Sequence, residues 1–578
     1  MTAYLVLASI GLLLALLMHG RVTPAPLFAS LAACYHLAGL VDQKTWLTSY
    51  TNPALAVLVL LLLVSLALER SPVLDRVSDT LLRGRQGWAV FRFASVTSLF
   101  SAFLNNTAVV GAMLGVISRQ RHQPASRLLI PLSYAAVFGG VTTLVGTSTN
   151  LVVSSFMVNA GMAPLGMFDP MWVGLPVALV CLVVMSLGVR LLPSHEANGR
   201  ESQQAYFLET RVEPGSAMAG RSIEQNQLRS LEGLFLLEIV RDGRLISPVA
   251  PAEVLEVGDV LIFTGEIDKV AALQRFDGLR VFGVEAGSLL RSNLLEVIVS
   301  SQSELANRTL RGVDFRTMFD AGVVGIRRGD RRLTGQLGRI PLRVGDSLLL
   351  AVGPDFSQHR NLDRNFHVLG GTLVRPRLTA MQSRLTLGGF ALVIALATFD
   401  VLSLFSGLLL LMAGLVLSGL LTLGEMRRRF PFDLVLVIGS ALTIARVLED
   451  SGAAALVAGA MRSVFDGYGV WGALVGLYLL TVVLTEMVTN NAAAALSFPI
   501  AISTAHALGV DPMPFVMVVL YGASACFLIP FGYQTHLMVY TPGRYRMRDF
   551  LRAGLPVSLA YGVTVLLLVP VFFPFHTS

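Results

Sequence analysis

Charged side chains are scarce in this chain. Asp, Glu, Lys and Arg make up 14% of its 578 residues, while hydrophobic residues make up 54%. Soluble domains carry about 25% charged residues, so this scarcity excludes a chain built only of soluble domains. Apolar runs such as 5–18 and 54–68 approach the ~20 residues that a helix needs to cross a bilayer. The composition therefore predicts a polytopic α-helical membrane protein, with the lipid bilayer as its surroundings.

Cysteine is nearly absent, and what is present lies in apolar runs: Cys34, Cys181 and Cys526. This pattern argues against a disulfide framework and against a cysteine metal site. The first apolar run lacks a basic leading segment and a small-residue cleavage site, so we expect it to remain as a span rather than a signal peptide. The formal charge of +7 comes from basic residues at the ends of apolar runs, so no nucleic-acid partner is expected.

Composition divides the chain into two apolar blocks around a charged middle. The middle contains two similar segments, marked by the turns Val257-Gly258-Asp259 and Val344-Gly345-Asp346 and by short alternating runs before each turn. These patterns predict two α+β domains of roughly 80 residues. The expected domains are 1–194, a first membrane repeat; 195–290 and 291–380, an inserted pair; and 381–578, a second membrane repeat.

The two apolar blocks predict the same order of spans. The first shows spans near 4–19, 23–41 and 53–69, a broken span over 87–118, then 128–160 and 168–192; the second shows 384–400, 402–423 and 432–448, a broken span over 469–506, then 512–541 and 550–573. Five crossings and one re-entrant hairpin in each block would give the two blocks opposite orientations, the inverted repeat of secondary transporters.

Arginines favour one side of the membrane as cytoplasmic, which also places 195–380 in the cytoplasm. They are Arg21, Arg70, Arg76, Arg83, Arg85, Arg119, Arg121, Arg127, Arg190, Arg427, Arg428, Arg429, Arg544, Arg546 and Arg548. The expected location is a bacterial inner membrane.

Polar and small residues interrupt four apolar segments. Two tips contain Asn105-Asn106-Thr107 and Thr489-Asn490-Asn491, which align at an offset of 384. Two further breaks contain Gly146-Thr147-Ser148-Thr149-Asn150 and Gly532-Tyr533-Gln534-Thr535-His536, aligned at an offset of 386. Irregular backbone at membrane depth requires protein or a water-filled cavity around it, so paired breaks indicate a midplane binding site.

Half-helix N-termini and neutral amide and hydroxyl groups at such breaks favour an anion. The tips carry no Lys or Arg, so bound sodium would supply the compensating charge for a divalent anion. The expected substrate-binding residues are Asn105, Asn106, Thr107, Thr147, Ser148, Thr489, Asn490, Asn491, Tyr533 and Gln534. The expected sodium ligands are Ser101, Asn105, Asn106, Gly146, Thr485, Thr489, Asn490 and Gly532. The alternative is that these Asn and Thr side chains only hold helices together, at about 0.6–2 kcal/mol for each bond.

Three ionisable residues lie within apolar segments and are candidates for function. Glu486 adjoins Thr485 and would tune a cation site or carry a proton, or would anchor the hairpin interior. His536 would touch substrate or bond within the helix bundle. For Arg446, near Glu449 and Asp450, we favour a structural ion pair.

At these tips and breaks the sequence resembles the divalent anion/sodium symporter family, whose hairpins carry Ser-Asn-Thr tips. The middle segments resemble the TrkA-C type of regulatory lobe, and permeases that combine these parts resemble the sulfate branch of the family. The resemblance implies sodium-coupled import of a divalent anion, sulfate first, by a homodimer with elevator-type alternating access. Tyr533-Gln534 and the varied outer tip residues depart from the family pattern.

Other functions stay open at this point. A sodium/C4-dicarboxylate or other organic-anion symporter would use the same fold. A ligand-regulated channel or potassium transporter lacks support, since no filter sequence recurs four times and no Gly-x-Gly-x-x-Gly nucleotide motif is present. No partnered nucleophile or metal cluster indicates an enzyme, and no organic cofactor is expected. The middle domains would bind a small regulatory ligand or support the dimer.

Overall fold

The computed structural model describes most of the chain. It covers residues 1–19, 22–68, 70, 81–82, 86–119, 123–194, 206–228, 231, 234–242, 244–246, 249–265, 279–282, 294–300, 303–313, 315–329, 331–333, 337–352, 356, 361–368, 378–465 and 469–575. The expected domain boundaries near 195 and 290, and Arg21, Arg76, Arg83, Arg85 and Arg121, lie outside these residues.

The first apolar block folds into helices in the predicted order, with two helices ending at the breaks. Its elements are α1 (Thr2–His19), α2 (Pro24–Leu37), α3 (Gln43–Tyr50), α4 (Pro53–Leu68), α7 (Gln86–Ser101), α8 (Asn106–Arg119), α9 (Leu129–Gly140), α10 (Ser148–Asn159) and α11 (Met171–Leu187). The sequence did not predict the short helix α3, which is capped by Asp42; the Asp42 carboxylate accepts from the Thr45 N–H at 3.3 Å.

The second block also follows the predicted order, with two further helices over 423–429 and 453–465 that the sequence did not predict. Its elements are α14 (Ala380–Thr398), α15 (Leu404–Leu417), α16 (Leu423–Arg429), α17 (Phe432–Asp450), α18 (Ala453–Phe465), α19 (Gly469–Met487), α20 (Asn490–Leu508), α21 (Met513–Gly522), α22 (Gln534–Tyr540) and α23 (Met547–Phe572). Gly39 and Gly419, just beyond α2 and α15, both have φ of +71°, a left-handed conformation that favours glycine at a helix end.

The two blocks also pack against each other in matching pairs. Helix α2 packs on α17 and α15 packs on α4, while α10 packs on α20 and α22 packs on α8. Six of the described helical segments are long and apolar enough to cross a membrane: Thr2–His19, Gln43–Leu68, Met171–Leu191, Met381–Thr398, Gly469–Met487 and Met547–Phe572. The protein is thus a multi-pass helical membrane protein.

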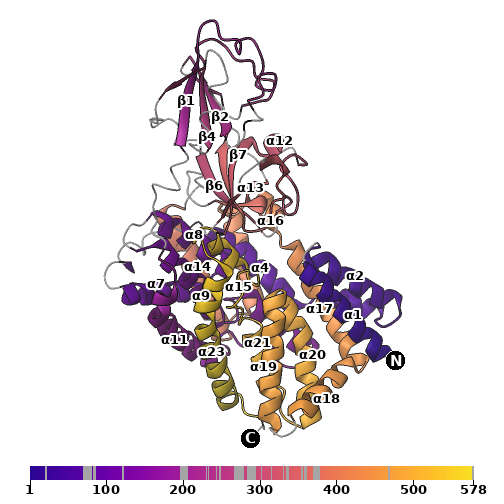
Figure 1. Ribbon diagram of the computed structural model, residues 1–578. Coiled ribbons are helices and arrows are strands. Elements are labelled where there is room, and N and C mark those ends of the chain that lie inside the picture. The colour runs from indigo at the N-terminus through magenta and orange to yellow at the C-terminus, as the bar shows by residue number, and fades with distance from the viewer. Residues whose placement is uncertain are drawn as a thin grey trace.

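The middle of the chain contains two sheets, which project from one end of the helical body, the second nearer the helices (Figure 1). The first has the order β3-β2-β4-β1-β5 and the second β10-β6-β9-β7-β8, both antiparallel. The strands are β1 (Tyr206–Val212), β2 (Leu234–Arg241), β3 (Arg244–Ile246), β4 (Val260–Gly265), β5 (Leu279–Phe282), β6 (Leu294–Val299), β7 (Ala321–Arg328), β8 (Arg331–Leu333), β9 (Ser347–Val352) and β10 (Phe366–Val368). Short helices α12 (Phe315–Phe319) and α13 (Leu362–Asn365) flank the second sheet.

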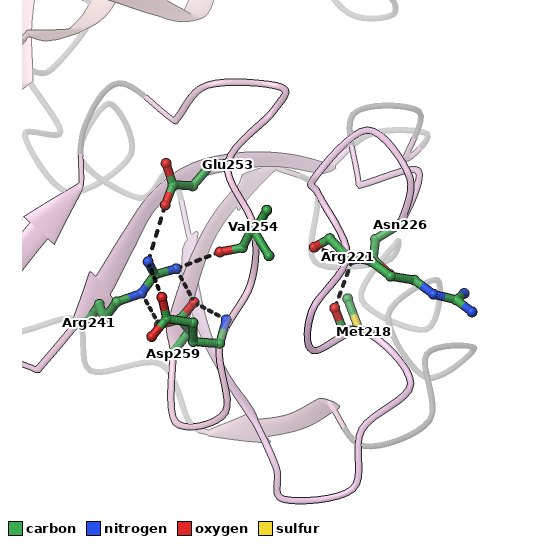
Figure 2. A network of polar contacts seen from close by, with 8 residues as sticks. Met218, Arg221, Asn226, Arg241, Glu253, Val254 and Asp259 are labelled. Atoms are coloured by element: carbon green, nitrogen blue, oxygen red, sulfur yellow. Dashed lines mark hydrogen bonds and ion pairs between the residues drawn. The ribbon is translucent and has the colours of Figure 1, made fainter.

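The same ion pair holds the predicted turn in both sheets. In the first sheet, Nε and Nη2 of Arg241 each donate to the Asp259 carboxylate at 2.9 Å, and Nη1 donates to Glu253 at 3.3 Å (Figure 2). The bonds to Asp259 raise the pKa of the Arg241 guanidinium. In the second sheet, Nε and Nη2 of Arg328 each donate to the Asp346 carboxylate at 2.7 Å. A bidentate pair fixes both position and orientation, so each Val-Gly-Asp turn is tied to its neighbouring strand.

Candidate functional site

The two hairpin tips are helix breaks capped in the same way. Helix α7 ends at Ser101 and α8 begins at Asn106; α19 ends at Met487 and α20 begins at Asn490. The Asn105 side chain accepts from the Thr107 N–H at 2.9 Å, and the exposed Thr489 side chain accepts from the Ala492 N–H at 3.4 Å. These caps satisfy part of each free helix N-terminus and leave the remaining N–H groups near the tip.

A buried hydroxyl meets a buried amide behind each tip. Ser101 Oγ lies 2.7 Å from the Asn106 side-chain amide, and Thr485 Oγ1 lies 2.9 Å from Asn490 Oδ1. The Thr485 hydroxyl also lies 2.5 Å from the Ala523 carbonyl oxygen. Each pair thus places side-chain oxygens beside a carbonyl oxygen, the type of ligand that a hard cation such as sodium prefers.

The Asn106 amide lies at the centre of the first of these clusters. With its nitrogen toward the Ala136 and Gly146 carbonyl oxygens, at 3.1 and 3.2 Å, its oxygen accepts from Tyr533 Oη at 2.8 Å. The reverse orientation directs Oδ1 at the Ser101 hydroxyl and Nδ2 at Tyr533. The first orientation gives both amide groups suitable partners, so the Asn106 side chain joins Ser101, Ala136, Gly146 and Tyr533 in one hydrogen-bond network.

The first partner break, between α9 and α10, is folded tightly against its tip. A Cβ atom at Gly146 would lie 2.6 Å from the Gly140 carbonyl oxygen and 2.9 Å from that of Ala102, so only glycine fits. The Thr143 hydroxyl bonds the Ala102 carbonyl, and the Asn150 amide donates to the Thr143 carbonyl at 2.7 Å. The polar Thr142-Thr143 pair belongs to this break in the sequence, but Thr143 was not among the predicted site residues.

The second partner break, between α21 and α22, is held by a carboxylate. Both Glu486 oxygens accept backbone hydrogen bonds, from Leu528 N at 2.7 Å and from Ile529 N at 3.0 Å. At the equivalent N-cap positions, Thr147 and Tyr533 share an extended backbone, with φ of −137° and −141°. Glu486 thus anchors the hairpin interior, one of the two roles that the sequence left open.

Each break meets the tip of the opposite half. Tyr533 Oη contacts Asn106, and Asn491 Oδ1 accepts from the Ser148 and Thr149 hydroxyls at 3.3 and 3.4 Å. Half-buried Thr107 lies in the first turn of α8, and half-buried Gln534 begins α22. The predicted substrate and sodium residues therefore lie on two tips and two breaks that pack across the halves.

The other two ionisable candidates have structural contacts. His536 is fully buried, its Nδ1 lies 2.7 Å from Ser133 Oγ, and its Nε2 donates to the Cys526 carbonyl at 2.6 Å. Arg446 pairs with Asp450 at 3.1 Å on an exposed helix face, as the sequence predicted. Among the described residues, no group of three or more His, Cys, Asp and Glu side chains is placed to hold a metal ion.

Known proteins match nearly the whole chain. The citrate transporter family, CitMHS, matches residues 4–521. A Chlamydomonas reinhardtii protein named "Putative sulfur deprivation response regulator" is 31% identical over 93% of this chain and 95% of its own length. An uncharacterized transporter of Synechocystis is 30% identical over 92% of this chain and 90% of its own.

A further relative is named for its substrates. Sodium/sulfate cotransporter 1 of Chlamydomonas reinhardtii is 30% identical over 61% of this chain and 42% of its own length. The family match covers the first apolar block, the two sheets and the second block as far as α21, and it includes both hairpin tips. The chain belongs to the citrate transporter family and is a multi-pass membrane transporter.

Proposed function

We propose that the protein is a sodium-coupled secondary transporter that imports a divalent anion, with sulfate as the first candidate. The observation that carries the proposal is the pair of buried hydroxyl–amide contacts, Ser101 with Asn106 and Thr485 with Asn490, at a constant offset of 384. Because each pair lies beside a tip that meets the opposite break, both halves contribute to one site.

Charge balance supports sodium as the coupling ion. The tips and breaks carry no Lys or Arg, and Glu486 lies directly behind the second tip. A dianion near this carboxylate would be repelled in a low-dielectric site unless cations were bound with it. Sodium at the Ser101–Asn106–Gly146 and Thr485–Asn490–Gly532 clusters would supply that charge, so anion and sodium would bind together.

Sulfate is favoured over larger anions by the second break and by the relatives' names. Tyr533 occupies the position that Thr147 occupies in the first half, and its hydroxyl reaches Asn106. The tyrosine ring is larger than a threonine side chain, so it would leave less room for an anion between the tips. The cotransporter relative is named for sodium and sulfate. The family description, citrate transporter, makes an organic dianion such as a C4-dicarboxylate the second candidate.

The proposal includes how the transporter is assembled. The two blocks would form an inverted repeat that moves by elevator-type alternating access within a homodimer, in a bacterial inner membrane. The sheets, two TrkA-C-like domains, would lie in the cytoplasm. The swapped packing of α2 on α17 and α15 on α4 supports a two-fold relation between the blocks.

Uptake into proteoliposomes tests the proposal. An inward sodium gradient should drive accumulation of labelled sulfate, whereas equal potassium or proton gradients should not. Unlabelled sulfate and thiosulfate should compete more strongly than succinate, citrate or taurine. Stronger competition by citrate or succinate would establish the second candidate, and anion-independent sodium or potassium conductance would contradict coupled transport.

A further inference from the structure

The turn of the second sheet docks directly on the helix that follows the second break. The Thr541 hydroxyl, just beyond α22, donates to the Gly345 carbonyl at 2.5 Å, and Thr541 is 1% exposed. A Cβ atom at Gly345 would lie 3.3 Å from Leu537 Cδ2 and 4.0 Å from Leu537 Cβ. The backbone of the turn at Gly345 therefore lies so close to helix α22 that glycine is favoured at this position.

Two neighbouring contacts extend this interface. A Cβ atom at Gly329, at the β7–β8 turn, would lie 3.1 Å from the Tyr540 ring and 3.2 Å from the Tyr545 carbonyl oxygen. Ile298 of β6 is 1% exposed and belongs to the same buried cluster as the membrane helices. The second sheet thus holds the end of α22 through a buried hydrogen bond and apolar contacts.

Among the residues that the structure describes, none makes such a contact with the equivalent turn of the first sheet. Gly258 has the same left-handed backbone, with φ of +96° against +84° at Gly345. Within the described part of the chain, no atom lies within 4 Å of a Cβ at Gly258, and neighbouring Val257 is 52% exposed. Since the two turns are alike in sequence and ion pair, the docking is particular to the second sheet and is not a general property of the turn.

Helix α22 connects this docked turn to the candidate site. It runs from Gln534 to Tyr540, about 10 Å at about 1.5 Å for each residue, and Tyr533 lies immediately before it. We infer that the second sheet is a positioning element for the site: the Gly345 turn holds α22 so that Tyr533 stays on Asn106. This inference rests on the proposed function for its effect on transport, but not for the contact itself.

Separating the turn from α22 would break the buried Thr541–Gly345 hydrogen bond and expose the apolar side chains packed around it, which costs free energy. The contact should therefore persist through the transport cycle. The second sheet would then move with α22 and act as part of the same body. A gating role, in contrast, would require the contact to open in each cycle.

Cysteine cross-linking tests the contact without reference to transport. A Cβ–Cβ distance of 4.0 Å between Gly345 and Leu537 lies within the ~3.5–4.5 Å range of disulfides. In a Cys34→Ser background, Gly345→Cys with Leu537→Cys should form a disulfide on oxidation in membranes, detected by mass spectrometry. The matched pair, Gly258→Cys with Leu537→Cys, should not. Equal cross-linking of both pairs, or of neither, would overturn the contact.

Transport by the same protein tests the positioning role. Thr541→Val removes the hydroxyl and should raise the KM for sulfate about threefold to tenfold with little change in maximal rate, because the site is misplaced but intact. Gly345→Ala should act in the same direction, while Gly258→Ala, with the same backbone strain, should match wild type.

Oxidation should leave the KM and the maximal rate of the Gly345→Cys/Leu537→Cys transporter the same as in its reduced form. Arrest on oxidation would instead establish a gate, and unchanged kinetics in Thr541→Val would refute positioning. If no variant, wild type included, transports an anion, the proposed function fails while the cross-link still decides the contact.

Discussion

Tyr533 and Asn106, 427 residues apart in the chain, lie 2.8 Å apart through the tyrosine hydroxyl and the side-chain amide. The tyrosine belongs to the break of the second half and the asparagine to the tip of the first. The tyrosine hydroxyl therefore helps to fix the position and orientation of the Asn106 amide. Tyr533 is thus one of the residues that join the two halves, together with Asn491, which contacts Ser148 and Thr149.

Removing that hydroxyl should weaken binding without unfolding the protein. In Tyr533→Phe the Asn106 amide loses one partner, so we expect the KM for sulfate to rise about twofold to tenfold. Tyr533→Thr, which copies Thr147, should widen the site and increase competition by succinate and citrate. Uptake of labelled sulfate measures both effects. Tyr35→Phe, which removes a buried hydroxyl bonded to Ser9 on α1, is the matched control and should transport normally.

The two buried asparagines should be indispensable. Asn106→Ala and Asn490→Ala each remove an amide that meets a buried hydroxyl, together with a proposed sodium ligand, so sodium-driven uptake should fall by about 100-fold or more. Asn159→Ala, at an exposed position at the end of α10, is the control and should retain activity. If either tip variant transports at the wild-type rate, the two-tip site is wrong.

Thr485 allows the proposed sodium site to be tested separately from the packing of helix α19. Thr485→Ala should raise the sodium concentration for half-maximal uptake about tenfold or more, and Thr485→Ser, which keeps the hydroxyl, should restore it. Thr481 lies one turn earlier on α19, and its hydroxyl bonds the Leu477 carbonyl of the same helix at 2.8 Å. Thr481→Ala should therefore leave sodium dependence unchanged, and a similar shift in both variants would indicate a general packing defect.

The helix breaks and the strands could be predicted from the sequence because each depends on residues that are close together in the chain. Polar residues inside apolar runs cannot continue a lipid-exposed helix without cost, and alternation with Val-Gly-Asp turns is typical of strands. The ends of α7 at Ser101 and α19 at Met487 follow from the first signal, and β4 and β9, directly after the two turns, follow from the second. The roles assigned to the site residues stay predictions.

The sequence did not predict a short polar helix, a contact between distant segments, or the direction of one buried side chain. Helix α3 is short and polar, so it carries no apolar run to reveal it, and it forms because Asp42 caps it. The docking of Gly345 on Leu537 joins segments almost 200 residues apart, which no periodicity encodes. Glu486 could face either the site or the backbone, and one rotamer choice decides between a ligand and an anchor.

Glu486 provides the last prediction, because its two backbone bonds make it structural while its position makes it look functional. Glu486→Gln retains one oxygen but turns an N–H₂ group toward the N–H of Leu528 or Ile529, so one backbone donor loses its acceptor. The expected cost is about 1–3 kcal/mol, visible as a lower midpoint of thermal unfolding in detergent. Glu449→Gln, on an exposed helix face, should leave the midpoint unchanged. Sodium-driven uptake by folded Glu486→Gln protein should persist, since the carboxylate contacts backbone and not the tip amides; complete loss of uptake at an unchanged midpoint would instead make Glu486 a participant in ion coupling.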